Sequence, residues 1–285
     1  MATPLDNSTE HPTAAPQWQD PAVPTGTQVA PNDAAPYPYF LSLVLPAHNE
    51  VGNLEWVVRE ALAALPTLFR ACEIIVVDDG STDETPALAD RLAATDDRVR
   101  VIHHPRNRGY GSALRSGFDA ARGDRILFMD TDRQFDIREV AKLAPLAATC
   151  DIVAGYRLKR HDPWRRVALG ATFNTIVKVL FGVWTRDIDC DFKLCRTELI
   201  RSLDLRAPGA LINTEILALA HRQGATVAEV GVCHYPRPTG EQSGGSLRVV
   251  ARSLDEMFRL WLRLRAEDRT PRPAAGRTLG TKVQE

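Results

Sequence analysis

The sequence predicts an α/β domain whose mostly parallel sheet is covered by helices on both faces. Several short segments, such as IIVV at 74–77, are runs of apolar residues, and each lies in a segment about as long as a β-strand. Segments with apolar residues at helical spacing alternate with them. Strands that are apolar throughout are typical of a parallel sheet buried between two helix layers. Folds of this class bind ligands beyond the carboxyl ends of their strands.

The predicted elements follow one another in a regular order. Each strand is predicted from an apolar run: FLSLVLPA (40–47), CEIIVVDDGS (72–81), VRVIHH (99–104), RILFMD (125–130) and DIVAGYR (151–157). Helical spacing marks segments 53–65 and 111–121, and another helix is predicted between the second and third strands. Thr82 or Asp83 is expected to cap the helix between these strands, with Pro86 near its first turn.

Composition narrows the class of protein. The chain has 285 residues, of which 44% are hydrophobic and 25% are charged, so it is long enough to bury a substantial core. The formal net charge of −1 gives no sign of a nucleic-acid partner. The five cysteines are scattered and odd in number, which disfavours a disulfide framework or a metal cluster and fits a reduced cytosolic chain.

The two ends of the chain differ in composition from the middle. The start is rich in Pro, Ala, Thr, Asn and Asp and lacks the features of a secretory signal, and the end is polar with prolines and glycines. No run of 18 apolar residues occurs, because Asn174 and Lys178 interrupt the longest candidate, 168–184. The predicted division is a disordered leader at 1–39, a catalytic domain at 40–245, an amphipathic helix at 246–266 and a disordered tail at 267–285.

Acidic residues gather just after the predicted strands. Asp78 and Asp79 follow the second strand, and Asp130 and Asp132 follow the fourth. Aspartate is also a common turn residue and helix cap, but two acidic pairs at one edge of the sheet favour a site. Asp130 and Asp132 can converge on one hard divalent cation, to which Gln134 can add an oxygen ligand. Such a cation takes its remaining ligands from water and substrate phosphates, which suggests a nucleotide diphosphate site.

A series of motifs makes the assignment more specific. In order, they are LPAHNE (45–50), VVDDGSTDET (76–85), NRGYGSALRSG (107–117), MDTDRQ (129–134), VAGYR (153–157) and DCDFKLCR (189–196). In this order, the chain resembles the inverting nucleotide-sugar glycosyltransferases of family 2, which have the GT-A fold. Within that family it is most similar to polyprenyl-phosphate sugar transferases of the dolichyl-phosphate mannosyltransferase type. The resemblance covers about residues 40–245.

The resemblance implies where the nucleotide binds. Pro46, His48 and Glu50 would line the base and the ribose, and Asp78 and Asp79 would accept hydrogen bonds from the nucleoside. His48 stands where the relatives usually have tyrosine. Alternatively, Glu50 is a carboxylate that stabilises a helix start.

The resemblance also implies a diphosphate site with a metal ion. Gly109 and Gly111 would let the backbone approach the diphosphate, although they can equally form a turn before a helix. Asp130, Asp132 and Gln134 would hold Mg²⁺ or Mn²⁺, which stabilises the negative charge of the leaving nucleoside diphosphate.

Basic residues point to a phosphate on the acceptor. By the resemblance, Arg157, Arg165 or Arg166, and Arg237 hold the phosphate of the lipid, since arginine forks match phosphate oxygens. The alternative is a solvated basic face. The relatives often have a serine after this basic segment, and here Leu169 and Gly170 occupy that place.

The predicted catalytic residues are Asp130, Asp132, Asp191 and Arg157. A phosphate monoester is already a competent nucleophile at neutral pH, so no strong general base is required. Asp189, Asp191 and Glu215 remain candidates for sugar recognition or for a base. For Glu215, a role at a helix terminus is an alternative.

The predicted activity is metal-dependent transfer of a hexose, with inversion, from a GDP- or UDP-linked donor to a polyprenyl phosphate. Two alternatives stay open: transfer to a hydroxyl group of a soluble or polysaccharide acceptor, and a module that binds a nucleotide sugar without turnover. The sequence leaves the sugar, the base and the oligomeric state undetermined.

The C-terminal helix suggests a membrane surface as a partner. Segment 246–265 has apolar residues at spacings of three and four, including Trp261, together with five arginines. This pattern suits a helix lying in an anionic interface, and segment 167–184 would add a second contact. The prediction is a peripheral protein on the cytoplasmic face of the membrane. The alternative is that the helix packs its apolar side on the sheet.

Overall fold

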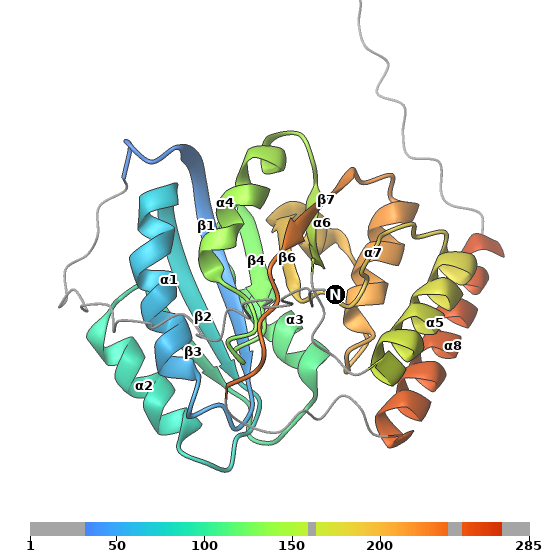
Figure 1. Cartoon of the computed structure of the whole chain (residues 1–285), viewed down its shortest axis with the longest axis horizontal. Helices are drawn as coiled ribbons and strands as arrows, with labels where there is room; N and C mark the ends of the chain where they lie inside the picture. The colour runs from blue at the N-terminus through green and yellow to red at the C-terminus, as the bar shows by residue number, and fades with distance from the viewer. Residues whose placement is uncertain (1–31, 159–163, 239–246, 270–285) are drawn as a thin grey trace, which may run out of the picture.

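The computed structural model describes residues 32–158, 164–238 and 247–269, and these residues form one sheet with helices on both faces (Figure 1). The order of the strands in the sheet is β3-β2-β1-β4-β6-β5-β7. The strands are β1 (Tyr37–Ala47), β2 (Phe69–Asp78), β3 (Val99–His103), β4 (Arg125–Met129), β5 (Ile152–Arg157), β6 (Phe192–Arg196) and β7 (Val227–Val232).

The prediction of a mostly parallel sheet is confirmed. β1 pairs in parallel with β2 and β4, β2 with β3, and β5 with β7. β6 runs antiparallel to both of its neighbours, β4 and β5. Neither β6 nor β7 was predicted: Lys193 interrupts the apolar residues of FKLCR, and Glu229 interrupts those of VAEVGV.

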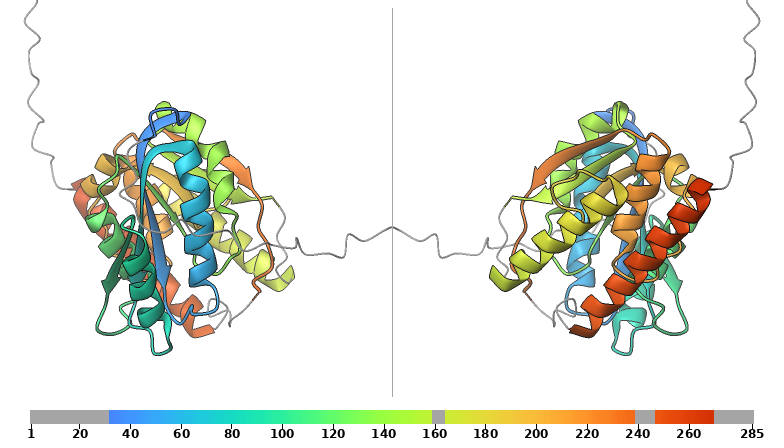
Figure 2. Two further views of the ribbon diagram at one scale, coloured as in Figure 1. Left: turned by 90° about the vertical axis from the view of Figure 1, so that its left-hand side faces the viewer. Right: turned by 90° about the vertical axis from the view of Figure 1, so that its right-hand side faces the viewer.

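The helices divide into two layers, each with its own part of the core. Helices α1 and α2 pack on one face of the sheet, and α3, α6 and α7 pack on the other. α8 runs along the outside of that second layer (Figure 2). The helices are α1 (Leu54–Leu68), α2 (Thr85–Thr95), α3 (Tyr110–Ala120), α4 (Val140–Leu143), α5 (Trp164–Phe181), α6 (Thr197–Ser202), α7 (Ile212–Arg222) and α8 (Leu247–Arg269), with short 3₁₀ turns at Ile137–Glu139 and Ala144–Ala148.

Two strands begin three residues earlier than predicted. β1 begins at Tyr37 rather than at residue 40, and β2 begins at Phe69 rather than at residue 72. Tyr37 and Phe69 are partners in the sheet, with their ring centroids 5.8 Å apart, so an aromatic pair extends both strands. The leader up to residue 31 and the tail from residue 270 lie outside the described residues.

The predicted cap of α2 was wrong in detail. The N-cap is Glu84, and neither Thr82 nor Asp83 occupies that position. Asp83 instead lies one residue earlier, where its carboxylate accepts from the backbone N–H of Thr85 at 2.9 Å. Thr82 turns toward Asn49, whose side-chain oxygen accepts from the Thr82 N–H at 2.8 Å.

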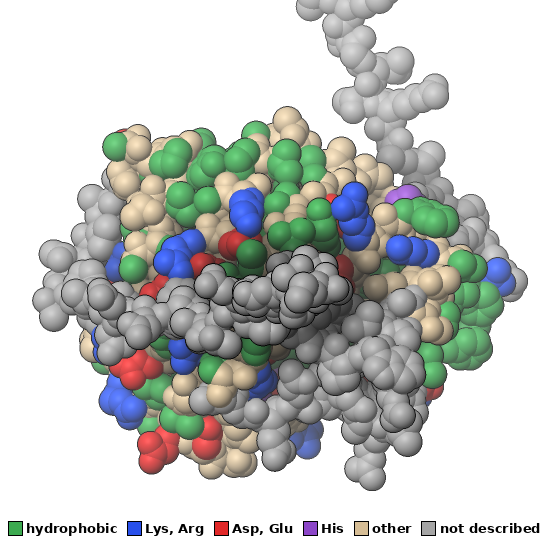
Figure 3. All heavy atoms as spheres, in the orientation of Figure 1, with side chains coloured by type: hydrophobic (Ala, Val, Ile, Leu, Met, Phe, Trp, Pro, Cys, Tyr) green, Lys and Arg blue, Asp and Glu red, His purple; other side chains and the backbone are tan. Residues whose placement is uncertain are grey.

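The surface shows no separation of charge on the face drawn in Figure 3. Lys and Arg side chains lie interspersed with Asp and Glu there, in keeping with the small net charge. Within the described ranges, none of the helices is long and apolar enough to cross a membrane.

Candidate active site

The direction of β6 brings two acidic motifs to the same edge of the sheet. Met129, the last residue of β4, pairs with Phe192, the first residue of β6. Because the two strands are antiparallel, Asp130 after β4 and Asp191 before β6 become neighbours. Burial raises the pKa of Asp130 well above its usual range, and the negative charges of Asp191 and Asp132 raise it further. The predicted site residues Asp130, Asp132 and Asp191 are therefore brought together.

Asp132 is largely buried and connects this edge to Arg237. Burial raises the pKa of the Asp132 carboxyl to about 6, against the opposing effects of the Gln134 N–H and the Arg237 charge. The Gln134 N–H donates to Asp132 Oδ1 at 3.0 Å, and Arg237 Nη1 lies 3.6 Å from Oδ2. Arg237 Nη2 donates to Glu50 Oε1 at 2.5 Å. One guanidinium thus links the loop after β1 to the loop after β4.

The segment that carries Arg237 is fixed to the loop after β4. The side-chain amide of Gln134 donates to the carbonyl of Tyr235 at 3.0 Å, and the Tyr235 N–H donates to the Gln134 carbonyl at 2.9 Å. Arg133 lies between Asp132 and Gln134. Its φ is 63°, and its guanidinium lies 4.4 Å from the centroid of the Trp56 ring. A left-handed backbone at a bulky residue is uncommon and often marks a functional turn.

The donor atoms at this edge fit a hard divalent cation. Among the described residues, no three His, Cys, Asp or Glu side chains form a metal site by themselves. The predicted set is two carboxylates and one amide, from Asp130, Asp132 and Gln134. An ion held by so few protein ligands completes its coordination with water and substrate phosphates, as Mg²⁺ does in nucleotide sites. Burial is the main cause of the raised pKa values of Asp130 and Asp132, and neighbouring carboxylates add to the rise; a bound cation would favour the ionised forms.

Three residues next to Asp191 were missed by the sequence analysis. Asp191 Oδ1 accepts from the Tyr110 hydroxyl at 2.8 Å and from the Asn213 side-chain amide at 2.6 Å. Lys193 Nζ in turn donates to Asn213 Oδ1 at 2.9 Å. Burial raises the pKa of Tyr110, so its hydroxyl stays protonated and able to donate. Tyr110 and Lys193 stand inside the quoted motifs, but Asn213 comes from α7 and no sequence signal marks it.

The loop after β1 is placed by contacts with the loop after β2. Pro46 is buried at the end of β1, and its carbonyl accepts from Thr131 Oγ1 at 2.7 Å. His48 is exposed, and its ring nitrogen Nδ1 donates to the carbonyl of Asp79 at 3.0 Å. The exposed ring leaves His48 accessible to a ligand at this edge.

Asp78 and Asp79 hold loops in this structure. Asp78 accepts from the Ser81 N–H at 3.0 Å and from His103 Nδ1 at 2.9 Å. Asp79 accepts from His104 Nδ1 at 2.7 Å and from the N–H groups of residues 108 and 109 at 2.9 and 2.8 Å. Both oxygens of Asp79 are therefore used inside the protein. The predicted bonds from these carboxylates to a nucleoside stay predictions.

Gly109 and Gly111 make room for a neighbouring loop. Gly109 has a φ of 97°, in the region that favours glycine, and a Cβ there would meet the carbonyl oxygen of Pro208 at 2.4 Å. A Cβ on Gly111 would meet the carbonyl of Ala207 at 2.3 Å. In this structure the two glycines thus allow α3 to begin against residues 207–208. Their predicted contact with the diphosphate stays a prediction.

The predicted phosphate-binding arginines have different surroundings. Arg157 forms a two-point ion pair with Asp187, with Nε and Nη2 at 2.6 and 2.7 Å from the carboxylate oxygens, and both side chains are largely buried. A phosphate would have to share or displace that partner. Arg165, Arg166, Leu169 and Gly170 lie in α5, where the structure describes the backbone of these residues but not their side-chain surroundings.

The remaining candidate carboxylates, Glu215 and Asp189, have different surroundings. Glu215 is fully buried in α7 and accepts from the N–H groups of Arg206 and Ala207 and from Arg263 Nη2, at 2.9, 2.7 and 2.6 Å. These contacts match the structural alternative for Glu215. Burial raises the pKa of Asp189 to about 6, and the charge of Asp191 adds to that rise.

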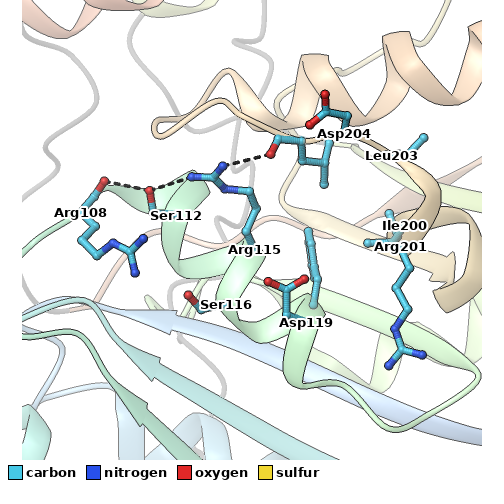
Figure 4. A pocket seen from close by; sticks show the side chains of 11 residues that line it. Arg108, Ser112, Arg115, Ser116, Asp119, Ile200, Arg201, Leu203 and Asp204 are labelled. Carbon is cyan, nitrogen blue, oxygen red and sulfur yellow. Dashed lines mark hydrogen bonds between the residues drawn. The ribbon is translucent and has the colours of Figure 1, made fainter.

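A cavity of about 330 Å³ lies apart from these carboxylates, between the outer side of α3 and residues 200–205 (Figure 4). Arg115 spans it, donating to the Leu205 carbonyl at 3.0 Å and to Ser112 Oγ at 3.3 Å. None of the predicted site residues lines this cavity.

Comparisons with known proteins point to one family. The model of glycosyl transferase family 2 matches residues 42–204. Polyprenol monophosphomannose synthase of Mycolicibacterium smegmatis is 35% identical over 221 residues, which cover 72% of this chain and 82% of that protein. Glycosyltransferase AglD of Haloferax volcanii is 34% identical over 242 residues, which cover 81% of this chain but 38% of that protein.

A third relative is an undecaprenyl-phosphate 4-deoxy-4-formamido-L-arabinose transferase of Pseudomonas paraeruginosa. It is 33% identical over 220 residues, which cover 75% of this chain and 63% of that protein. The chain therefore spans less than two thirds of AglD and of this transferase. Among solved structures, glucosyl-3-phosphoglycerate synthase from Mycobacterium tuberculosis, with Mn²⁺, UDP-glucose and phosphoglyceric acid, has a TM-score of 0.61 at 24% identity and covers 79% of each chain. This likeness confirms the predicted GT-A fold.

Proposed function

Because the chain belongs to glycosyl transferase family 2, we propose that it transfers a hexose from a nucleotide diphosphate sugar to a polyprenyl phosphate. The observation that supports this proposal is the edge of the sheet that β4 and β6 share. Asp130, Asp132 and Asp191 lie close together there, and Arg237 lies next to Asp132. Two of the relatives have a polyprenol or an undecaprenyl phosphate in their names, which supports this class of acceptor.

The reaction is a displacement at C1 of the sugar. An oxygen of the acceptor phosphate forms the new bond to C1 as the bond from C1 to the donor diphosphate breaks, and the electron pair leaves with the nucleoside diphosphate. Attack from the face opposite the leaving group inverts the anomeric configuration. Asp130, Asp132 and Gln134 would hold Mg²⁺ or Mn²⁺, which supplies positive charge at the leaving diphosphate.

The side chains of this chain supply orientation and charge. Asp191 would accept from a sugar hydroxyl beside the metal ligands, and Arg237 would bind an acceptor phosphate. The dianionic phosphate attacks without a strong base, which agrees with the internal contacts of Glu215. Arg157 would add a second cation for the acceptor, next to Asp187.

We further propose that the protein works at the cytoplasmic surface of a membrane. Among the described side chains of α8, from residue 254 to residue 267, the apolar ones fall into two stripes. Met257, Leu260 and Leu264 are buried against the protein, whereas Phe258 and Leu262 are 56% and 47% exposed. At the end of α5, Val179 and Trp184 are likewise 74% and 78% exposed. Exposed apolar side chains beside Arg259 and Arg265 suit an anionic lipid interface, where a polyprenyl phosphate is found.

An acceptor panel tests the transferase proposal. Purified protein, Mn²⁺ or Mg²⁺ and radiolabelled UDP- and GDP-hexoses are incubated with a polyprenyl phosphate, the corresponding polyprenol, or a soluble glycan. We expect label in the lipid fraction with the phosphate only. Transfer to the glycan but not to the lipid would favour the hydroxyl-acceptor alternative. Donor binding without turnover of any acceptor would favour the binding module.

A further inference from the structure

Lys193 is a buried cation with an unusual set of partners. The side chain lies in β6, is 0% exposed, and donates to the carbonyl oxygens of Ile188, at 3.1 Å, and of Cys190. Its third partner is Asn213 Oδ1, at 2.9 Å. An ammonium group has three N–H donors, so all of them are used. The charge of Lys193 also acts on Asp189, whose pKa it lowers against the effect of burial, and burial of such a charge is costly unless it is paired and hydrogen-bonded.

Lys193 determines which way the amide of Asn213 faces. Because the ammonium can only donate, the amide oxygen of Asn213 must point toward it. The amide nitrogen is then directed at Asp191 Oδ1, to which it donates at 2.6 Å. With the amide reversed, its N–H groups would face the N–H groups of Lys193, and the oxygen would face the carboxylate. The lysine thus makes Asn213 a donor to Asp191.

Side chains from two helices donate to the same oxygen of Asp191. Tyr110 at the start of α3 and Asn213 in the first turn of α7 both donate to Asp191 Oδ1. Lys193 also binds two carbonyls of the loop 188–190, which leads into Asp191. Both the backbone before Asp191 and the orientation of its side chain are therefore set by one buried cation.

We propose that Lys193 and Asn213 are positioning residues that orient the carboxylate of Asp191 toward the sugar of the donor. This inference rests on the proposed function, in which Asp191 contacts the sugar beside the metal ligands. With Oδ1 held by two donors, the carboxylate of Asp191 keeps one orientation, in which it also faces the carboxyl of Asp130. Displacement of a positioned group by about 1 Å can reduce a rate about 100-fold.

The decisive variant is Asn213→Asp. It keeps the shape of the side chain and an oxygen for Lys193 but replaces the donor to Asp191 with a second oxygen. If the only role of Asn213 is to accept a hydrogen bond from Lys193, this variant should behave like the wild type. If Asn213 orients Asp191, we expect kcat for hexose transfer to fall about 10- to 100-fold, while KM for the polyprenyl phosphate stays within about twofold because the acceptor arginines are untouched.

Two further variants complete the set. Lys193→Met keeps most of the length of the side chain without charge and should reduce kcat as Asn213→Asp does. Lys142→Met is the matched control, because Lys142 is an exposed lysine paired with Glu139 at 2.9 Å, and it should leave kcat unchanged. Circular dichroism melting shows which variants fold. Should Lys193→Met fail to fold, Asn213→Asp still decides the question.

A readout without turnover separates this inference from the proposed function. In protein labelled with ¹⁵N-asparagine, the side-chain N–H groups of Asn213 should exchange slowly with solvent in the wild type, and faster in Lys193→Met. Unchanged protection in that variant, or unchanged kcat in folded Asn213→Asp, would overturn the positioning role. If the wild type transfers no sugar while the exchange result holds, the proposed function fails and the orientation of Asn213 by Lys193 stands.

Discussion

The guanidinium of Arg237 lies 3.6 Å from the carboxylate of Asp132, with Nη1 facing Oδ2. Its other terminal nitrogen binds Glu50 Oε1 at 2.5 Å. All three side chains are largely buried, so the charge of the arginine acts on the two carboxylates with little screening by solvent. A predicted ligand of the donor's metal ion and a predicted ligand of the acceptor phosphate therefore interact directly.

Substitution Arg237→Met should change cation and acceptor binding in opposite directions. Removal of the positive charge leaves Asp132 more attractive to a divalent cation, so we expect Mn²⁺ to bind several-fold more tightly in the absence of donor. KM for the polyprenyl phosphate should rise at least about tenfold, because a charge-assisted contact is worth about 1.5–3 kcal/mol. Free Mn²⁺ is measured by electron paramagnetic resonance. Arg138→Met, which removes an exposed partner of Asp136, is the control. Weaker Mn²⁺ binding in Arg237→Met would contradict the prediction.

Asp132→Asn should abolish transfer without loss of stability. A metal ligand is lost, so we expect kcat to fall at least about 100-fold. The free energy of unfolding at neutral pH should stay the same or rise, since burial raises the pKa of this carboxyl to about 6 and its ionised form is therefore unfavourable in the folded state. Urea titration of the metal-free protein and an assay of transfer are the two measurements. Near-wild-type activity would remove Asp132 from the site.

His103 should make stability depend on pH. Its hydrogen bonds with Asp78 and then Asp90 raise its pKa above the ordinary value of 6.5. A raised folded pKa means that the charged histidine stabilises the fold below about pH 6.5. This contribution is lost as the pH rises through the raised value.

The matching variant is His103→Gln. It should be less stable than the wild type at about pH 6, with a smaller difference at about pH 9, where the wild-type histidine is neutral. Urea unfolding at the two pH values measures this difference. An equal loss of stability at both would show that the charge of His103 contributes nothing.

The exposed stripe of α8 should bind anionic liposomes. The double substitution Phe258→Ser and Leu262→Ser removes two exposed apolar side chains without touching the buried stripe. We expect the partition coefficient measured by flotation to fall at least about tenfold, since each apolar side chain contributes about 1.5–3 kcal/mol when fully buried. The control is Val51→Ser with Leu146→Ser, which changes two exposed apolar residues elsewhere. If the wild type stays soluble with anionic and neutral lipids at low salt, the interfacial proposal is wrong.

Local sequence patterns are enough to predict the class of fold and the position of Asp130 and Asp132. Apolar runs such as 74–77 and 126–129 are local patterns, because a strand buried on both faces is mostly apolar along its length. Acidic residues directly after such runs reach the carboxyl edge of a parallel sheet whatever the order of the strands. Asp130 and Asp132 could therefore be placed at a ligand-binding edge before any contact was known.

The residues that act together are set by contacts between distant parts of the chain. The short strand β6 enters the sheet in the opposite direction, and this reversal brings Asp191 beside Asp130. Arg237 reaches Glu50 across 187 positions of sequence, and Lys193 orients Asn213, which lies in a different element. The spacing of apolar residues in the sequence indicates whether a side chain is buried. It carries no information about which residue a buried charge or amide contacts. These pairings depend on strand order, strand direction and loop packing, which are properties of the folded chain.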